Sequence, residues 1–120
     1  MLRDFVIQRR ATLIEAINVI NRNRSRTAIV LDGEKVIGTI SEGDIMRALL
    51  GGADVHARLA DFVQVGFRYL NEKNYDKALA LMHPSGIMLI PVVDKEFHLK
   101  DVITLGEVLD RLLPREKKSV

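Results

Sequence analysis

The sequence contains no cysteine, and only 5% of its 120 residues are aromatic. Without thiols the chain can form no disulfide and offers no thiolate for nucleophilic chemistry. The longest apolar run, residues 87–93, is far shorter than the roughly 18 to 20 residues of a membrane-spanning helix. The polar residues near the N-terminus leave no apolar core for a signal peptide. We therefore expect a cytoplasmic protein without a membrane partner.

A large excess of one charge is also absent, because the formal net charge is only +2. Nucleic-acid-binding domains usually carry a dense basic footprint and often aromatic side chains that stack on bases. Four arginines could still form a basic patch, although solvated surface charges are the simpler interpretation: Arg9, Arg10, Arg22 and Arg24. We expect no nucleic-acid partner, and salt-dependent binding would test this.

The sequence gives little support for enzymatic activity or for a metal site. The three histidines, His56, His83 and His98, lack the paired spacing of metal ligands. No nucleophile with a base and an orienting group can be assembled from the sequence. We expect a chain that is not an enzyme, has no catalytic residue and no metal site, and requires no cofactor.

What the sequence does contain is one pattern twice. The motif Thr12-x-x-Glu15-Ala16 has its counterpart in residues 74–78, and the apolar run that ends at Asp32 has its counterpart in the run that ends at Asp94. The segment 38–44, Gly-Thr-Ile-Ser-Glu-Gly-Asp, corresponds to residues 101–107, Asp-Val-Ile-Thr-Leu-Gly-Glu. An internal repeat fixes the architecture. The second copy carries one extra residue after Asp94.

Each copy is predicted to have the order β-α-β-β-α. Thr12 with Glu15, and Ser41 with Asp44, form capping patterns at helix starts. Asp32-Gly33 indicates a hairpin, and Gly51-Gly52 a helix end. In the second copy we expect strands at residues 63–69, 88–93 and 97–103, a helix at 75–82 that His83-Pro84 stops, and a helix from Thr104 to near Pro114. Pro91 should lie near the start of its strand or where the strand needs no N–H donor.

These residues resemble the CBS domain, on the strength of T-x-x-E-A, the apolar strand that ends in Asp, and G-x-I-S-x-x-D, in order and twice. The first copy is similar to the CBS pairs attached to sugar-phosphate nucleotidyltransferases. The resemblance implies an α/β fold of two β-α-β-β-α repeats packed about a pseudo-twofold axis, at residues 1–60 with the linker and 61–114, before a basic, frayed tail at 115–120. It also implies a homodimer and a ligand such as AMP, ADP, ATP or S-adenosylmethionine between the copies.

For the first ligand site the resemblance implies Gly38, Thr39, Ser41 and Asp44, with residues 87–89 (Ile87, Met88 and Leu89) as an apolar wall for adenine. Ser41 begins a helix, whose N-terminal N–H groups suit phosphate, and the Asp44 carboxylate can accept from two ribose hydroxyls. Gly38 would let the backbone approach the ligand closely. The alternative is that Ser41 and Asp44 only cap the helix.

For the second site the resemblance implies Thr104 and Glu107, with Arg26 from the other copy as a phosphate contact. Glu107 stands in place of the usual Asp, and Asp101 in place of the usual Gly, where a carboxylate would repel phosphate. The alternative for the second site is a degenerate site retained for packing. The alternative for Arg26 is an exposed arginine in a loop.

Taken together, the sequence predicts a regulatory module that binds an adenosine-containing ligand and modulates an attached or partner protein, for example a nucleotidyltransferase. The alternative is a dimeric interaction scaffold without a working nucleotide site. A thermal-shift panel of nucleotides separates the two.

Overall fold

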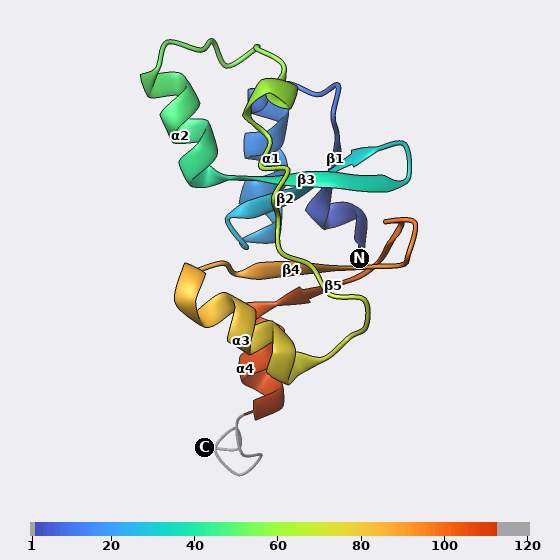
Figure 1. The fold of residues 1–120 in the computed structure, drawn as a ribbon. Coiled ribbons are helices and arrows are strands. Elements are labelled where there is room, and N and C mark those ends of the chain that lie inside the picture. The colour runs from blue at the N-terminus through green and yellow to red at the C-terminus, as the bar shows by residue number, and fades with distance from the viewer. Residues whose placement is uncertain (1, 113–120) are drawn as a thin grey trace.

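The computed structural model describes residues 2–112 and shows two layers of strands between two layers of helices (Figure 1). The first repeat has strands β1 (Val6–Gln8), β2 (Thr27–Asp32) and β3 (Lys35–Ser41), with helices α1 (Leu13–Asn23) and α2 (Glu42–Leu50). The second has α3 (Tyr75–Ser85), β4 (Leu89–Val93), β5 (Leu99–Thr104) and α4 (Leu105–Leu112). Short 3-10 helices lie at Leu2–Phe5 and Leu59–Phe62. The predicted α/β class is confirmed.

The helices of each repeat cover the outer face of that repeat's own sheet. In the first sheet the order is β1-β2-β3, with β1 parallel and β3 antiparallel to β2, whereas β4 and β5 form an antiparallel pair. Both predicted capping boxes are present: the Thr12 side chain accepts from the N–H of Glu15, and that of Ser41 from the N–H of Asp44. The left-handed backbone at Gly33 closes the predicted β2–β3 hairpin.

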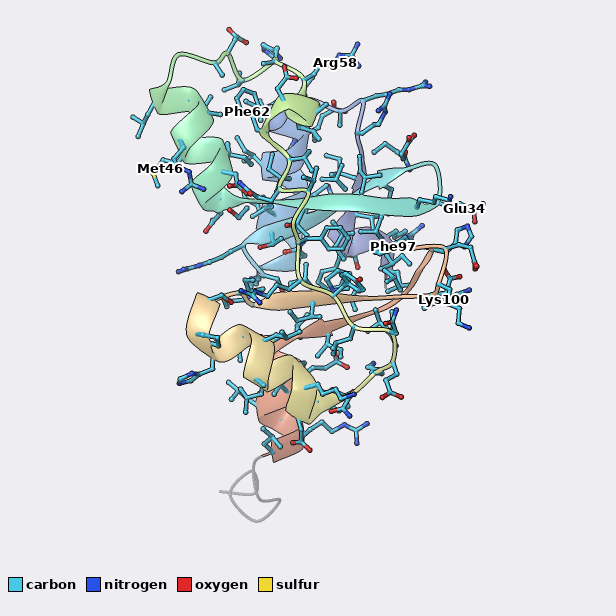
Figure 2. The ribbon with its side chains drawn as sticks, viewed as in Figure 1. Glu34, Met46, Arg58, Phe62, Phe97 and Lys100 are labelled. Carbon is cyan, nitrogen blue, oxygen red and sulfur yellow. The ribbon has the colours of Figure 1, made fainter. Side chains whose placement is uncertain are left out.

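The inner faces of the two sheets meet in a shared apolar core. Ile29 and Val36 from the first sheet pack in one cluster with Leu89, Val93 and Val102 from the second. Phe67 and Phe97 pack against this cluster, and Tyr69 contacts both of their rings; the ring centroids of the three are 5.0 to 6.3 Å apart. Figure 2 shows Phe97 between the two sheets. Since β2 and β4 are therefore buried on both faces, each repeat needs the other to shield its sheet.

The strand expected at residues 63–69 is not formed. Gln64 pairs with Thr39 of β3, whereas Leu70 pairs with Val92 of β4, so the two ends of this segment join different sheets. The residues between them cross the gap between the repeats and cannot continue one ladder (Figure 1). This crossing segment, residues 63–70, lies beside both sheets and positions side chains between them.

Two other boundaries differ from the sequence prediction. Helix α3 continues through Pro84 to Ser85, because a proline in the last turn removes only one hydrogen bond, and the left-handed Gly86 ends the helix instead. The last strand begins at Leu99 instead of residue 97, because Phe97 adopts a left-handed conformation in the longer turn after Asp94.

Pro91 lies in the middle of β4, at a position that needs no donor, as predicted. Its carbonyl accepts from the N–H of Leu70, and the N–H of Val93 donates to the Leu70 carbonyl on the same edge. Pro114 and the tail at residues 115–120 lie outside the described residues, and the domain limits stay a prediction. Among residues 2–112 no helix is long and apolar enough to span a membrane.

The crossing segment lies close against β3 at Gly38. An added Cβ there would lie 2.3 Å from Cγ1 of Val63 and 2.6 Å from the carbonyl oxygen of Gln64. We predict that Gly38→Ala lowers the free energy of unfolding by about 1–3 kcal/mol, the usual cost of overpacking. Gly66→Ala is the matched control, because no atom lies within 4 Å of its added Cβ, and its effect should stay within about 0.5 kcal/mol. Urea unfolding of both variants measures the difference, and equal stability would contradict the packing role.

Candidate functional site

The first cavity lies where the two repeats meet and has a volume of about 310 Å³. Its walls combine hydroxyl groups of the first repeat with apolar side chains of the second. The crossing segment closes it and contributes one positive charge. The lining residues are Thr27, Thr39, Ser41, Gln64, Gly66, Phe67, Arg68, Ser85, Ile87 and Leu89.

Four residues that the sequence singled out line this cavity together: Thr39, Ser41, Ile87 and Leu89. They come from distant parts of the chain, as the resemblance implied. Met88 is not among the lining residues; its carbonyl accepts from the N–H of Leu105 at the start of α4. The cavity therefore offers an apolar wall from two of the three residues expected, beside a polar wall of hydroxyls.

Asp44 does not line the first cavity, and its carboxylate is fully engaged within the protein. One oxygen accepts from the N–H and the hydroxyl of Ser41 at 2.8 and 3.0 Å. The other accepts from Arg47 at 2.7 Å and from Gln64 at 3.0 Å. Asp44 is only 7% exposed and lies on a neighbouring cavity of about 650 Å³. In this structure Asp44 caps α2, and a ribose that bound its carboxylate would have to displace Arg47 or Gln64.

Gly38 lies against the crossing segment. Its missing side chain makes room for Val63 and for the backbone at Gln64, and it is not among the residues that line the first cavity. A close approach of a ligand to Gly38 stays a prediction.

The second cavity, of about 380 Å³, occupies the corresponding place in the second repeat. It contains Thr104 and Glu107, as predicted, together with Asp101 and Lys73, and its apolar walls are Leu2, Phe5 and Val102. The Lys73 ammonium lies 3.2 Å from Asp101 and 3.1 Å from Glu107. The same Glu107 oxygen accepts from the Tyr75 hydroxyl at 3.1 Å. The polar groups of this cavity therefore satisfy one another.

The ion pairs of the second cavity shift the protonation of their members. The hydrogen bond to Glu107 raises the pKa of Lys73, Asp101 adds to this effect, and partial burial opposes it. Partial burial acts to raise the pKa of Asp101, but the N–H of Val102 and the Lys73 ammonium outweigh it, so this pKa lies below its ordinary value. Counted as formal charges, the cavity holds two carboxylates and one ammonium, one more negative than positive charge.

Arg26 does not line the second cavity. Its guanidinium lies 3.6 Å from Glu42 at the start of α2, within its own repeat. Its backbone adopts a left-handed conformation and its carbonyl accepts from the N–H of Glu42. The alternative of an exposed loop arginine therefore describes the position that the structure gives it.

Sequence reasoning missed Arg68, Gln64 and Lys73. The crossing segment was expected to be a strand, so its side chains were not considered as cavity residues. An available signal was that Arg68 and Lys73 flank the apolar start of the second repeat, where the first repeat has Val6 and Ala11.

The β4–β5 turn brings together three potential metal ligands that the histidine spacing did not suggest. Ligand atoms of Asp94, Glu96 and His98 all lie within 4.8 Å of one another. The Asp94 carboxylate already accepts from the N–H groups of Glu96 and His98, and Lys100 lies 3.7 Å from it. These contacts are made within the hairpin itself, and they hold the end of the β4–β5 hairpin in place.

The chain is similar to known proteins in part of its sequence and in its fold. Residues 1–51 match the family model of the CBS domain. A search of curated protein sequences finds no match. Among solved structures, the CBS domain pair/ACT domain protein of Thermotoga maritima is 24% identical, with a TM-score of 0.74 over 89% of this chain and 86% of that one.

Two further structures extend the comparison. Staphylococcus aureus OpuCA is 26% identical, with a TM-score of 0.71 over 90% of each chain. A CBS domain protein of Pyrobaculum aerophilum, complexed with AMP, is 21% identical, with a TM-score of 0.73 over 92% of this chain and 85% of that one. The family model and the structural neighbours together support a CBS domain pair.

The ion pairs of Lys73 lead to a prediction about stability. Lys73→Met should lower the free energy of unfolding at pH 7 by less than about 1 kcal/mol for each pair lost, because all three side chains are partly exposed. Asp101 has a lowered pKa, so its contribution is present above about pH 4 and is lost on acidification. The variant should therefore lose less stability than the wild type between pH 7 and pH 3.

The raised pKa of Lys73 acts on the alkaline side, where its contribution is present below about pH 10 and is lost as pH rises through the folded value. Lys77→Met is the matched control, because Lys77 forms a more exposed pair with Glu72. Urea unfolding from pH 3 to above pH 10 measures the free energy of unfolding of the wild type and of both variants. If that free energy falls as steeply in Lys73→Met as in the wild type between pH 7 and pH 3, the assignment is contradicted.

Proposed function

We propose that this chain, which has the fold of a CBS domain pair, is a regulatory module that binds an adenosine-containing ligand in the first cavity. The observation that carries the proposal is the composition of that cavity. Ile87, Leu89 and Phe67 offer an apolar surface of the kind that adenine packs against, and Thr27 and Thr39 offer hydroxyls for ribose or phosphate. The fold shared with an AMP-bound CBS domain protein supports the same conclusion.

The ligand belongs to the class of AMP, ADP, ATP and S-adenosylmethionine. Its binding would bias the arrangement of the two repeats, because the cavity is built from both of them and from the segment that joins them. A ligand can change a partner's activity only by its difference in affinity between two such arrangements. The module thus acts on an attached or partner protein, for which a nucleotidyltransferase is one candidate, and does not itself catalyse a reaction.

A homodimer is the state in which we expect the module to act. A groove of about 420 Å³ runs between α1 and α2, with apolar walls from Ile17, Ile20, Ile45, Met46, Leu49 and Leu50. Met46 projects from the outer side of α2 (Figure 2), and Leu50 is 82% exposed. Apolar side chains gathered in this way are a frequent sign of a protein interface. A dimeric scaffold without ligand is the second candidate function that this groove favours.

The ligand proposal is tested by calorimetry with AMP and adenosine on two matched variants. Thr39→Val removes a cavity hydroxyl without changing the shape of the side chain, and should weaken AMP binding by about 0.5–1.5 kcal/mol. Thr104→Val removes a hydroxyl from the second cavity, one that also caps α4 by accepting from the N–H of Glu107 at 3.2 Å, and it should leave the AMP affinity unchanged. If neither compound binds the wild-type chain at millimolar concentration, the scaffold is the better account. An effect of Thr104→Val alone would place the ligand in the other cavity.

The dimer is tested by changing one exposed leucine. Leu50→Lys places a charge on the α1–α2 groove and should shift the chain to the monomer in light scattering at tens of micromolar, about the range of a weak dimer. Val65→Lys is the control, because Val65 is similarly exposed, at 76%, but lies on the crossing segment away from this groove. A wild-type monomer, or equal effects of the two changes, would contradict this interface.

A further inference from the structure

Three of the four backbone donors at the start of α2, which would ordinarily attract an anion, are already engaged. The N–H of Ser41 donates to Asp44 at 2.8 Å, and that of Asp44 to the Ser41 hydroxyl at 3.1 Å. The N–H of Glu42 donates to the Arg26 carbonyl at 2.9 Å. A phosphate in the first cavity therefore needs another strong donor.

Arg68 is the basic residue that lines the first cavity. It is exposed, and no carboxylate in residues 2–112 lies within ion-pair distance of it, whereas the guanidinium groups of Arg9, Arg26 and Arg47 each face one. None of the residues that line this cavity is acidic. The cavity thus carries one uncompensated positive charge. The hydroxyls of Thr27 and Thr39 also lack hydrogen-bond partners within the described part of the chain, so they can serve the same ligand.

The second cavity has the opposite balance. Its single cation, Lys73, is shared between Asp101 and Glu107 at 3.2 and 3.1 Å, which leaves one net negative charge. An anion entering it would face two carboxylates and would have to take Lys73 from both. The two cavities occupy corresponding places in the two repeats but differ in charge.

We propose that Arg68 binds the phosphate of the ligand in the first cavity, and that Asp101 and Glu107, which hold Lys73 between them, close the second cavity to anions. The chain would then bind one phosphorylated ligand, and Arg68 of the crossing segment would recognise its phosphate. The adenosine part of this ligand rests on the proposed function. The anion site itself rests only on the charges of the two cavities.

The experiment compares Arg68→Gln with Arg10→Gln, which removes the same charge. Among residues 2–112 the Arg10 guanidinium faces no carboxylate. The Arg10 carbonyl accepts from Arg58, which lies at the outer end of the first repeat (Figure 2). Calorimetry should give one AMP per chain in the wild type. Arg68→Gln should weaken AMP binding about tenfold or more, as expected for a charge-assisted hydrogen bond, and change adenosine affinity less than about twofold. Arg10→Gln and Lys73→Met should leave both affinities unchanged.

Several outcomes would overturn the inference: equal losses of AMP affinity in Arg68→Gln and Arg10→Gln, equal losses of AMP and adenosine in Arg68→Gln, or two equivalent AMP sites. Pyrophosphate separates the inference from the proposed function, because it carries phosphate without adenosine. If the wild type binds neither AMP nor adenosine, the proposed function fails. The inference then stands if pyrophosphate raises the melting temperature of the wild type and not of Arg68→Gln at matched ionic strength, and it fails otherwise.

Discussion

The structure depends on apolar contact between the two sheets. The residues at the centre of β2, Ala28 to Val30, and all of β4 are buried, so both faces of these strands are covered. A three-stranded and a two-stranded sheet, each with helices on one side only, would leave their other faces in water. Joining them removes this apolar surface from water. Residues from both repeats line each of the two cavities, so the cavities are a consequence of the same contact that stabilises the fold.

The crossing segment links this packing to function. Its ends are held by different sheets, through Gln64 on β3 and Leu70 on β4, and Gly38 allows it to lie against the first sheet. Between these fixed points it presents Phe67 to the shared core and Arg68 to the first cavity. Because the same few residues contact both repeats and line the cavity, a ligand bound there would act directly on the way the repeats are joined. This gives the proposed regulation a physical route.

The repeated motif does not produce two equal cavities. Ser41 and Thr104 begin corresponding helices, yet Asp101 in place of a glycine introduces a carboxylate that holds Lys73. The sequence indicated this asymmetry, since a carboxylate at that position is expected to repel phosphate. It did not indicate the neutralising lysine, which precedes α3 and reaches the cavity only through the folding of the second repeat. The charge of a cavity is a sum over side chains from separate elements, and one motif supplies only part of it.

The sequence by itself determined the α/β class, the two repeats, both capping boxes, the hairpins and the position of Pro91, because these follow from local patterns of apolar, capping and turn residues. It also brought Thr39 and Ser41 together with Ile87 and Leu89, through the resemblance of the repeats. Only the tertiary structure decided that residues 63–69 cross between sheets, that Asp44 is held by Arg47 and Gln64, and that Arg68 faces the first cavity. These outcomes depend on which hydrogen-bond donors and charges meet across the junction between the repeats, and no local pattern records that.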